Sequence, residues 1–487
     1  MKKILSIAFF ASLAAFTFVS CSTEEDDIFD NTAAERLNAI SDTYTKRMAA
    51  SKAGWVMEYY ATNDIFKYNE DISSRKNIAS GMCFLLMADF DADGSVKIGM
   101  KNAFSGLRIQ ANEDELSYIN TGDYKEVESL WEIIRDNGPV LSFNTYNEAF
   151  HTFTDPRAYS VDNLGYGVSG SGNKGVGIGG DYEFIMVDVP ENGDIVMLKG
   201  KKHGAYVRLT KLPDDTDFEA YLDDITAFQK KVFPRENPSY NVLTVKGDRF
   251  KTNDCFSTIM NLYPYDGDEL ADESYHPFAI TKRNGKYYLR FRDNFTYLYV
   301  VDNVEKDYEL QELVYDEAKD IFVDEKNPET ILEGAVPAQF FAEEVNGGKV
   351  WTINANSQMS ESFKAQYDDL KAKMKSNGSY TLTSLQLCTY NGEPTFRVYY
   401  QNSQRKPMSG YFAIDVKSEG DNATITIGEP LNDSATSIYN KVVALQEFFA
   451  TISSTAKIEA PVSRFNLSTV KMTIGGDTDK WVVLQHN

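Results

Sequence analysis

The sequence predicts a mainly β chain with helical connectors, an α+β class in which antiparallel meanders close as barrels or fold as sandwiches. Short apolar segments with a period of two are separated by turns rich in Gly, Asn and Asp, which is typical of such meanders. A block of these segments occurs three times along the 487 residues, each time with one helical segment. The blocks share no residue-level repeat, so we infer only a common architectural rhythm.

The first elements follow from a change of period. Residues 29–51 are expected to form a helix, because apolar side chains recur every three or four positions. From Gly54 the period is two, and Pro213 ends this first β block. Its expected strands are 55–60, 83–90, 95–101, 140–146, 182–189, 195–199 and 206–212.

The remaining elements repeat this order. A helix is expected at 217–233, since its acidic start and its final lysines suit the helix dipole. A second β block at 240–354 contains an Asn284-Gly285 hairpin turn, and a helix at 360–375 precedes a third block at 380–487 with a helix at 434–453. The expected units are a signal peptide at 1–20, an anchor, acidic tether and helix at 21–53, and β domains at 54–213, 214–357 and 358–487.

The N-terminus predicts a lipid anchor. Two lysines precede an apolar run at 4–19, which is too short for a stable membrane span and ends at Ser20-Cys21. Residues 18–21 resemble a bacterial lipobox with Phe18 where Leu is usual, so we expect Cys21 to carry acyl chains such as palmitate. Each buried methylene contributes roughly 0.8 kcal/mol, so several chains would hold the protein on outer-membrane lipid.

An acidic cluster directly follows the anchor. It resembles the surface-export signal of Bacteroidetes lipoproteins, and it comprises Glu24, Glu25, Asp26 and Asp27. We therefore expect the body to lie on the extracellular side of the outer membrane. No second apolar segment approaches the ~18–20 residues that a spanning helix needs, so lipid is the expected anchor.

The charge balance limits the partners. With 49 Lys and Arg against 72 Asp and Glu, the net charge is −23, which repels phosphate backbones and argues against nucleic acid and polyanionic partners. Glycans, peptides and other outer-membrane proteins remain as possible partners.

Cysteine and histidine usage predicts no cofactor or metal site. Cys83, Cys255 and Cys388 lie far apart without a CxxC pair, so we expect three buried free thiols, with a long-range disulfide or a reactive thiol as alternatives. The histidines at 151, 203, 276 and 486 have no metal-ligand spacing, and neither HExxH nor GxSxG occurs. No catalytic residue is assigned.

Three further patterns favour structural interpretations. Residues 89–94 open like a calcium loop, but Met100 stands where the bidentate carboxylate belongs, so we expect a hairpin turn. The GxGxxG match at 170–175 runs into a strand and is expected to be an interstrand loop, with a lid as the alternative. Asp181 and Glu183 lie about 6.6 Å apart along a strand, a separation compatible with a glycosidase, but among 72 acidic residues a solvated face is the simpler interpretation.

Tyrosines supply the candidate ligand-binding residues. Both faces of the segment around Arg290 and Arg292 are not expected to be fully buried, so Tyr288, Tyr297 and Tyr299 are candidates for binding a sugar ring or a protein. The alternative is that these rings fill β cores.

Several segments resemble a known family. They are 54–60 (GWVMEYY), 140–146 (VLSFNTY) with His151, 179–184 (GGDYEF), and 198–202 (LKGKK) with Gly204. Together they resemble the Bacteroidetes lipoproteins of domain of unknown function 4302, over about 21–212 and more thinly beyond. The family brings no assigned reaction or binding residues.

We expect a surface lipoprotein that binds a ligand or serves as an accessory protein in nutrient acquisition, and we do not expect an enzyme. The alternatives are a glycan or peptide hydrolase without a recognisable motif and a structural surface module. A cleft with two carboxylates of raised pKa would favour the enzyme.

Overall fold

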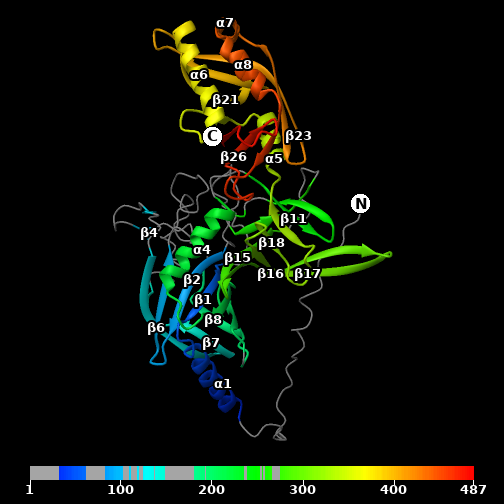
Figure 1. Ribbon diagram of the computed structural model, residues 1–487. Helices are drawn as coiled ribbons and strands as arrows, with labels where there is room; N and C mark the ends of the chain where they lie inside the picture. The colour runs from blue at the N-terminus through cyan, green and yellow to red at the C-terminus, as the bar shows by residue number, and fades with distance from the viewer. Residues whose placement is uncertain are drawn as a thin grey trace.

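The computed structural model is built mainly from antiparallel β-strands with a few helices, which confirms the predicted class (Figure 1). The strands form two closed barrels with an open sheet between them in the sequence. The described residues are 32–61, 83–101, 109–110, 118–119, 124–136, 138–147, 180–191, 193–234, 239–252, 255, 258–265 and 275–486.

Helix α1 (Ala33–Met48) leads into the first barrel. It begins at a capping box in which Thr32 and Glu35 bond each other's backbone N–H groups, and it ends with basic residues. The indole of Trp55 donates a 2.9 Å hydrogen bond to the Met48 carbonyl, which ties the helix to the barrel. The barrel strands are β1 (Trp55–Tyr60), β2 (Cys83–Phe90), β3 (Ser95–Lys101), β6 (Tyr124–Asp136), β7 (Gly138–Phe143), β8 (Glu183–Asp188), β9 (Ile195–Gly200) and β10 (Tyr206–Lys211).

The first barrel closes in the order β1-β10-β9-β8-β7-β6-β3-β2. Strand β1 is buried at every position, because its two faces contact different layers. Trp55, Met57 and Tyr59 point into the barrel, whereas Val56 packs into a core shared with the central sheet. A separate pair, β4 (Ile109–Gln110) and β5 (Tyr118–Ile119), lies outside the barrel.

The central sheet follows helix α4 (Phe218–Val232), which Asp217 caps. The Phe228 ring of this helix stacks on Tyr287 with centroids 3.7 Å apart. The strands of the central sheet run in the order β13-β15-β16-β17-β18-β19-β11-β12-β14. They are β11 (Asn241–Val245), β12 (Asp248–Thr252), β13 (Ile259–Asn261), β14 (Tyr263–Pro264), β15 (Tyr275–Arg283), β16 (Lys286–Val301), β17 (Val304–Asp316), β18 (Ile321–Val323) and β19 (Ile331–Gly334).

The C-terminal barrel closes in chain order from β20 to β27. Its first strand, β20, begins at Trp351, which lies before the domain boundary expected at 357. The helix expected at 434–453 is two helices that meet at Val442. Its helices are α5 (Pro337–Asn346), α6 (Glu361–Gly378), α7 (Asp433–Lys441) and α8 (Val443–Ile452). Its strands are β20 (Trp351–Ile353), β21 (Thr381–Tyr390), β22 (Glu393–Gln401), β23 (Pro407–Glu419), β24 (Asn422–Pro430), β25 (Thr455–Glu459), β26 (Thr469–Ile474) and β27 (Trp481–His486).

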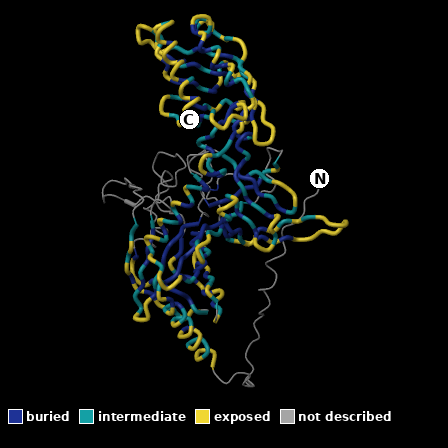
Figure 2. Tube along the Cα trace, viewed as in Figure 1, coloured by how far each residue is buried: buried dark blue, intermediate teal, exposed yellow. Residues whose placement is uncertain are grey.

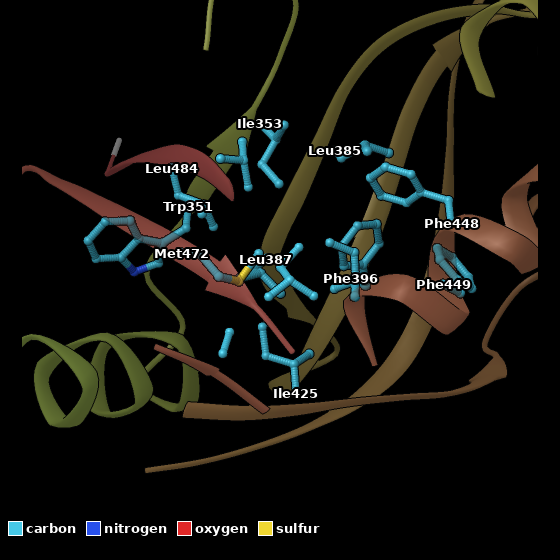
Figure 3. Packing of buried hydrophobic residues seen from close by; sticks show 14 of the residues in the cluster. Trp351, Ile353, Leu385, Leu387, Phe396, Ile425, Phe448, Phe449, Met472 and Leu484 are labelled. Atoms are coloured by element: carbon cyan, nitrogen blue, oxygen red, sulfur yellow. The ribbon is translucent and has the colours of Figure 1, made fainter. Parts of the chain in front are cut away.

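Large side chains fill this barrel. Leu387 and Phe396 point inward from neighbouring strands and meet Phe448 and Phe449 of α8 in one core (Figure 3). A cavity beside Trp351 has a volume of about 10 Å³, which leaves no room for an organic ligand.

Candidate functional site

The β16–β17 hairpin extends away from the central sheet, and its far end is exposed (Figures 1 and 2). Strand β15 pairs with β16 only as far as Phe291, and β18 pairs with β17 only from Val314. Over 295–301 and 304–310 the two strands pair with each other, and neither outer edge pairs with another described strand. Such edges are free to accept an added strand.

One face of the hairpin combines apolar and acidic columns. The register places Thr296, Leu298 and Val300 opposite Glu309, Asp307 and Glu305, and directly opposed residues share a face. Leu298 and Val300 are 65% and 64% exposed, which is unusual for neighbouring apolar side chains. We call these six residues the hairpin face.

The opposite face of the hairpin holds two of the predicted tyrosines. The Tyr297 hydroxyl donates to Asp248, and the Lys246 ammonium lies 5.7 Å from the centre of the Tyr299 ring. Burial and Asp248 raise the pKa of Tyr297 to about 12. Both rings are half-buried against the central core, so they support the hairpin from behind.

The structure does not bring the third predicted tyrosine to the same place. Tyr288 lies on the other side of a bulge in β16, where the pairing register shifts between Arg290 and Phe295. The Arg283 guanidinium covers its ring at 3.9 Å. Bulges of this kind bend a strand, and this one redirects the hairpin.

A buried arginine of the first barrel holds this bulge. Arg208 on β10 donates to the carbonyl oxygens of Phe291 and Arg292, at 3.3 and 3.1 Å. The same guanidinium lies 2.8 Å from the carboxylate of Glu58 on β1. Burial disfavours its charge, but Glu58 and neighbouring tyrosines outweigh burial and hold the pKa of Arg208 above its ordinary value.

The ionic contacts continue into the central sheet. Arg290 lies 3.8 Å from the other Glu58 oxygen and donates to Glu312 at 3.0 Å, and Arg283 donates to the same Glu312 oxygen at 2.7 Å. Burial would raise the pKa of Glu312, yet the two arginines outweigh it and lower that pKa. This network was not predicted from the sequence. The signal available in the sequence is a glutamate, Glu58, within an apolar strand segment, and the structure shows that this side chain is fully buried.

Asp181 of the carboxylate pair has a structural role. It is 3% exposed, and its carboxylate accepts hydrogen bonds from the backbone N–H groups of Lys202, His203 and Ala205 at 2.9–3.0 Å. Glu183 is half-buried and faces Lys201 at 3.4 Å. Asp181 therefore orders the β9–β10 turn. Asp181 and Glu183 do not face each other across a cleft, as the two carboxylates of a glycosidase would.

The other predicted features have varied outcomes. Cys83, Cys255 and Cys388 are buried and form no disulfide, as predicted, and residues 89–94 form the expected hairpin turn between β2 and β3. The anchor Cys21, the acidic cluster at 24–27, His151 and the 170–175 loop lie outside the described residues.

The described residues hold neither a metal-binding cluster nor a membrane-spanning helix. No group of three or more His, Cys, Asp or Glu in this part of the chain is placed to hold a metal. Within the same ranges, no helix has both the length and the apolar character needed to cross a membrane.

Comparison with known proteins places the chain in a family. The model of a domain of unknown function (DUF4302) matches residues 25–298. The chain belongs to this family. The predicted membership of the DUF4302 family is thereby confirmed. The matched segment ends within β16 and excludes the C-terminal barrel. No curated protein matches the chain.

Solved structures give only faint likenesses. The DNA polymerase III beta chain of Streptococcus pneumoniae TIGR4 is 9% identical, with 93% of this chain and 97% of that chain covered and a TM-score of 0.11. Intact Ap-TbpB is 8% identical, with 89% and 75% covered and a TM-score of 0.13. The transferrin binding protein B of serogroup B Neisseria meningitidis is 12% identical, with 86% and 68% covered and a TM-score of 0.12. TM-scores this low carry no structural or functional argument.

Proposed function

We propose that this DUF4302 protein is a binding protein, anchored through Cys21 on the extracellular side of the outer membrane, that serves as an accessory in nutrient acquisition. The observation that carries the binding proposal is the hairpin face, which projects from the central sheet with exposed apolar side chains and unpaired edges. Its contact with a partner would remove Leu298 and Val300 from water, which contributes about 25 cal/mol per Å² of buried apolar surface.

The chemistry of the hairpin face defines the partner. Glu305 and Asp307 have no Lys or Arg within ion-pair distance in the described ranges, while Glu309 accepts a 3.2 Å hydrogen bond from Asn294. A segment that contains both basic and apolar residues would match the two columns, with its basic residues at Asp307 and Glu305 and its apolar residues at Leu298 and Val300. The proposed partner is therefore a protein segment of that composition.

The back of the hairpin supports a preorganised site. Tyr308 donates to Asp324, Tyr297 donates to Asp248, and the Lys246 ammonium lies 4.7 Å from the Tyr308 ring. These contacts fix the two strands before a partner arrives, so less conformational entropy is lost on binding.

A peptide titration tests this proposal. A ten-residue peptide of alternating lysine and valine should bind the purified protein with a Kd of about 10 μM to 1 mM. A peptide of alternating glutamate and valine should not bind. The variant Leu298→Ser with Val300→Ser should lose at least about tenfold in affinity, equivalent to roughly 1.4 kcal/mol.

The control removes exposed apolar groups elsewhere. Val443 and Val462 are 58% and 71% exposed in the C-terminal barrel, and their replacement by Ser should leave peptide affinity unchanged. Equal binding of both peptides, no binding of either, or equal losses in the two variants would contradict the proposal.

A further inference from the structure

A second group of aromatic side chains lies on the outside of the C-terminal barrel, around Arg397. Phe396 and Val398 of β22 are buried in the barrel core, so Arg397 and Tyr399 point outward by strand alternation. The guanidinium carbon of Arg397 lies 4.4 Å from the centre of the Tyr399 ring and 5.7 Å from that of Tyr411. We call Arg397 with these rings and Tyr390 the aromatic platform.

The rings of the aromatic platform are ordered by contact across strands. Tyr390 and Tyr411 come from β21 and β23, the two strands that flank β22, and their rings stack with centroids 4.2 Å apart and planes 16° apart. Thr395 of β22 is 0% exposed, in keeping with rings that meet across this strand. The stacked pair therefore holds its apolar ring surface in a fixed position on paired strands.

Among the described residues, the Arg397 guanidinium donates its hydrogen bonds to neutral groups. Its Nε and Nη2 donate to the Ser409 hydroxyl at 3.0 and 2.8 Å, and its Nη1 donates to the Gln386 carbonyl oxygen at 3.2 Å. A guanidinium has five N–H donors, so these bonds leave further donors for a ligand. In the described part of the chain, no carboxylate forms an ion pair with Arg397.

In the described ranges Arg397 has no counter-charge, unlike several other half-buried cations that cover tyrosines. Lys251 over Tyr240 lies 3.8 Å from Glu343, and Lys282 over Tyr287 lies 2.8 Å from Asp224. In a chain of net charge −23, carboxylates are abundant, yet none in the described ranges forms an ion pair with Arg397. A partly desolvated guanidinium without an anion favours an anionic ligand, which it would bind through charge-assisted hydrogen bonds.

The remaining groups favour a sugar. Ring faces contact the apolar C–H surface of a pyranose, while hydroxyl and amide groups bond to its hydroxyls. In the described ranges, the hydroxyls of Tyr390, Tyr399 and Tyr411 form no hydrogen bond, so they are available to a ligand. We propose that the aromatic platform binds an oligosaccharide through one carboxylated sugar, with the carboxylate at Arg397 and the ring on a tyrosine.

The net charge of the protein limits the charge of the ligand that this site can bind. A strongly negative protein repels a polyanion at long range, whereas salt screens single charges beyond about 8–10 Å. The aromatic platform should therefore prefer an oligosaccharide with one carboxylate over a densely sulfated chain. This site is independent of the hairpin face, because it lies on another sheet.

Calorimetric titration of the purified protein tests the proposal with four probes. They are a trisaccharide ending in glucuronate, its neutral glucose counterpart, acetate, and heparin. The acidic trisaccharide should bind with a Kd of about 1 mM or below, and the neutral one at least about tenfold more weakly. Acetate and heparin should bind more weakly still.

Two variants and two controls complete the experiment. Arg397→Met should lose at least about tenfold in affinity for the acidic trisaccharide, and Tyr411→Ala should weaken both trisaccharides. Lys373→Met removes one exposed positive charge from α6 and should change neither affinity, and Leu298→Ser with Val300→Ser should also have no effect. No binding of the acidic trisaccharide, equal affinity for the neutral one or for acetate, or unchanged binding by the Arg397 and Tyr411 variants would overturn the proposal.

Discussion

The guanidinium of Arg208 lies 2.8 Å from the carboxylate of Glu58, and both side chains are buried where the first barrel meets the central sheet. Because the same guanidinium donates to the carbonyls of Phe291 and Arg292, the pair holds the bulge from which the hairpin extends. The direction of the hairpin thus depends on two charges from another sheet.

Removal of the Glu58 charge should destabilise the protein. Glu58→Gln would leave the buried guanidinium groups of Arg208 and Arg290 without their anion, and such losses cost about 3–5 kcal/mol. Urea unfolding should show this loss, and hydrogen exchange should show weaker protection at residues 293–299. Glu128→Gln is the control, because Glu128 is exposed and pairs with Lys97 at 3.8 Å, where loss of the pair should cost less than about 1 kcal/mol. Equal effects of the two changes would contradict the assigned role of Glu58.

Glu312 should make stability depend on acid pH. Its pKa is lowered in the folded protein from an ordinary value of 4.5, so the unfolded chain binds this proton first as the pH falls. The stabilisation is complete above pH 4.5 and is lost as the pH falls through the lower folded-state pKa. Urea unfolding of the native protein and Glu312→Gln should therefore differ most at neutral pH and progressively less below pH 4.5. A difference that stays constant from neutral to acid pH would show that the Glu312 charge has no such linkage.

Asp181 should contribute to stability and not to turnover. Asp181→Asn would place an amide donor among three backbone N–H donors, and loss of charged hydrogen bonds of this kind costs about 2–3 kcal/mol. Glu183→Gln on the same segment should cost less than about 1 kcal/mol, because that side chain forms a partly exposed pair with Lys201. Thermal unfolding measures both variants. A glycosidase activity lost in Asp181→Asn at unchanged stability would instead restore the hydrolase interpretation.

The sequence predicted periodic features well and contacts across sheets poorly. The period-two segments predicted seven of the eight strands of the first barrel, since alternation is a local property of the chain, but the long strand β6 was not predicted. Alternation also places Tyr297 and Tyr299 on one face, but the residues that cover this face, Asp248 and Phe250, come from β12, about forty-nine positions earlier. The Glu58–Arg208 pair spans 150 positions. Only the tertiary fold determines such partners, so the hairpin face was not predicted.

The proposed lipid anchor at Cys21 yields a direct prediction. Cys21→Ala should abolish acylation, because the alanine lacks the thiol that accepts the acyl chain. An alkyne analogue of palmitate should label the native protein, and the variant should partition into water in a detergent phase separation. Ser22→Ala keeps the thiol and should behave like the native protein. Acylation of the Cys21 variant would rule out this anchor.

Surface display depends, in our proposal, on the acidic cluster that follows the anchor. Alanine at Glu24, Glu25, Asp26 and Asp27 should leave acylation intact and keep the protein on the inner face of the outer membrane. Protease added to whole cells should then digest the native protein and spare this variant, while both are digested after lysis. The control removes the same charge from exposed positions of the C-terminal barrel, by alanine at Glu361, Asp369, Glu419 and Asp421. Because this control changes net charge equally, its digestion on whole cells would assign the effect to the position of the cluster. Equal digestion of the native protein and the cluster variant on whole cells would contradict the export role.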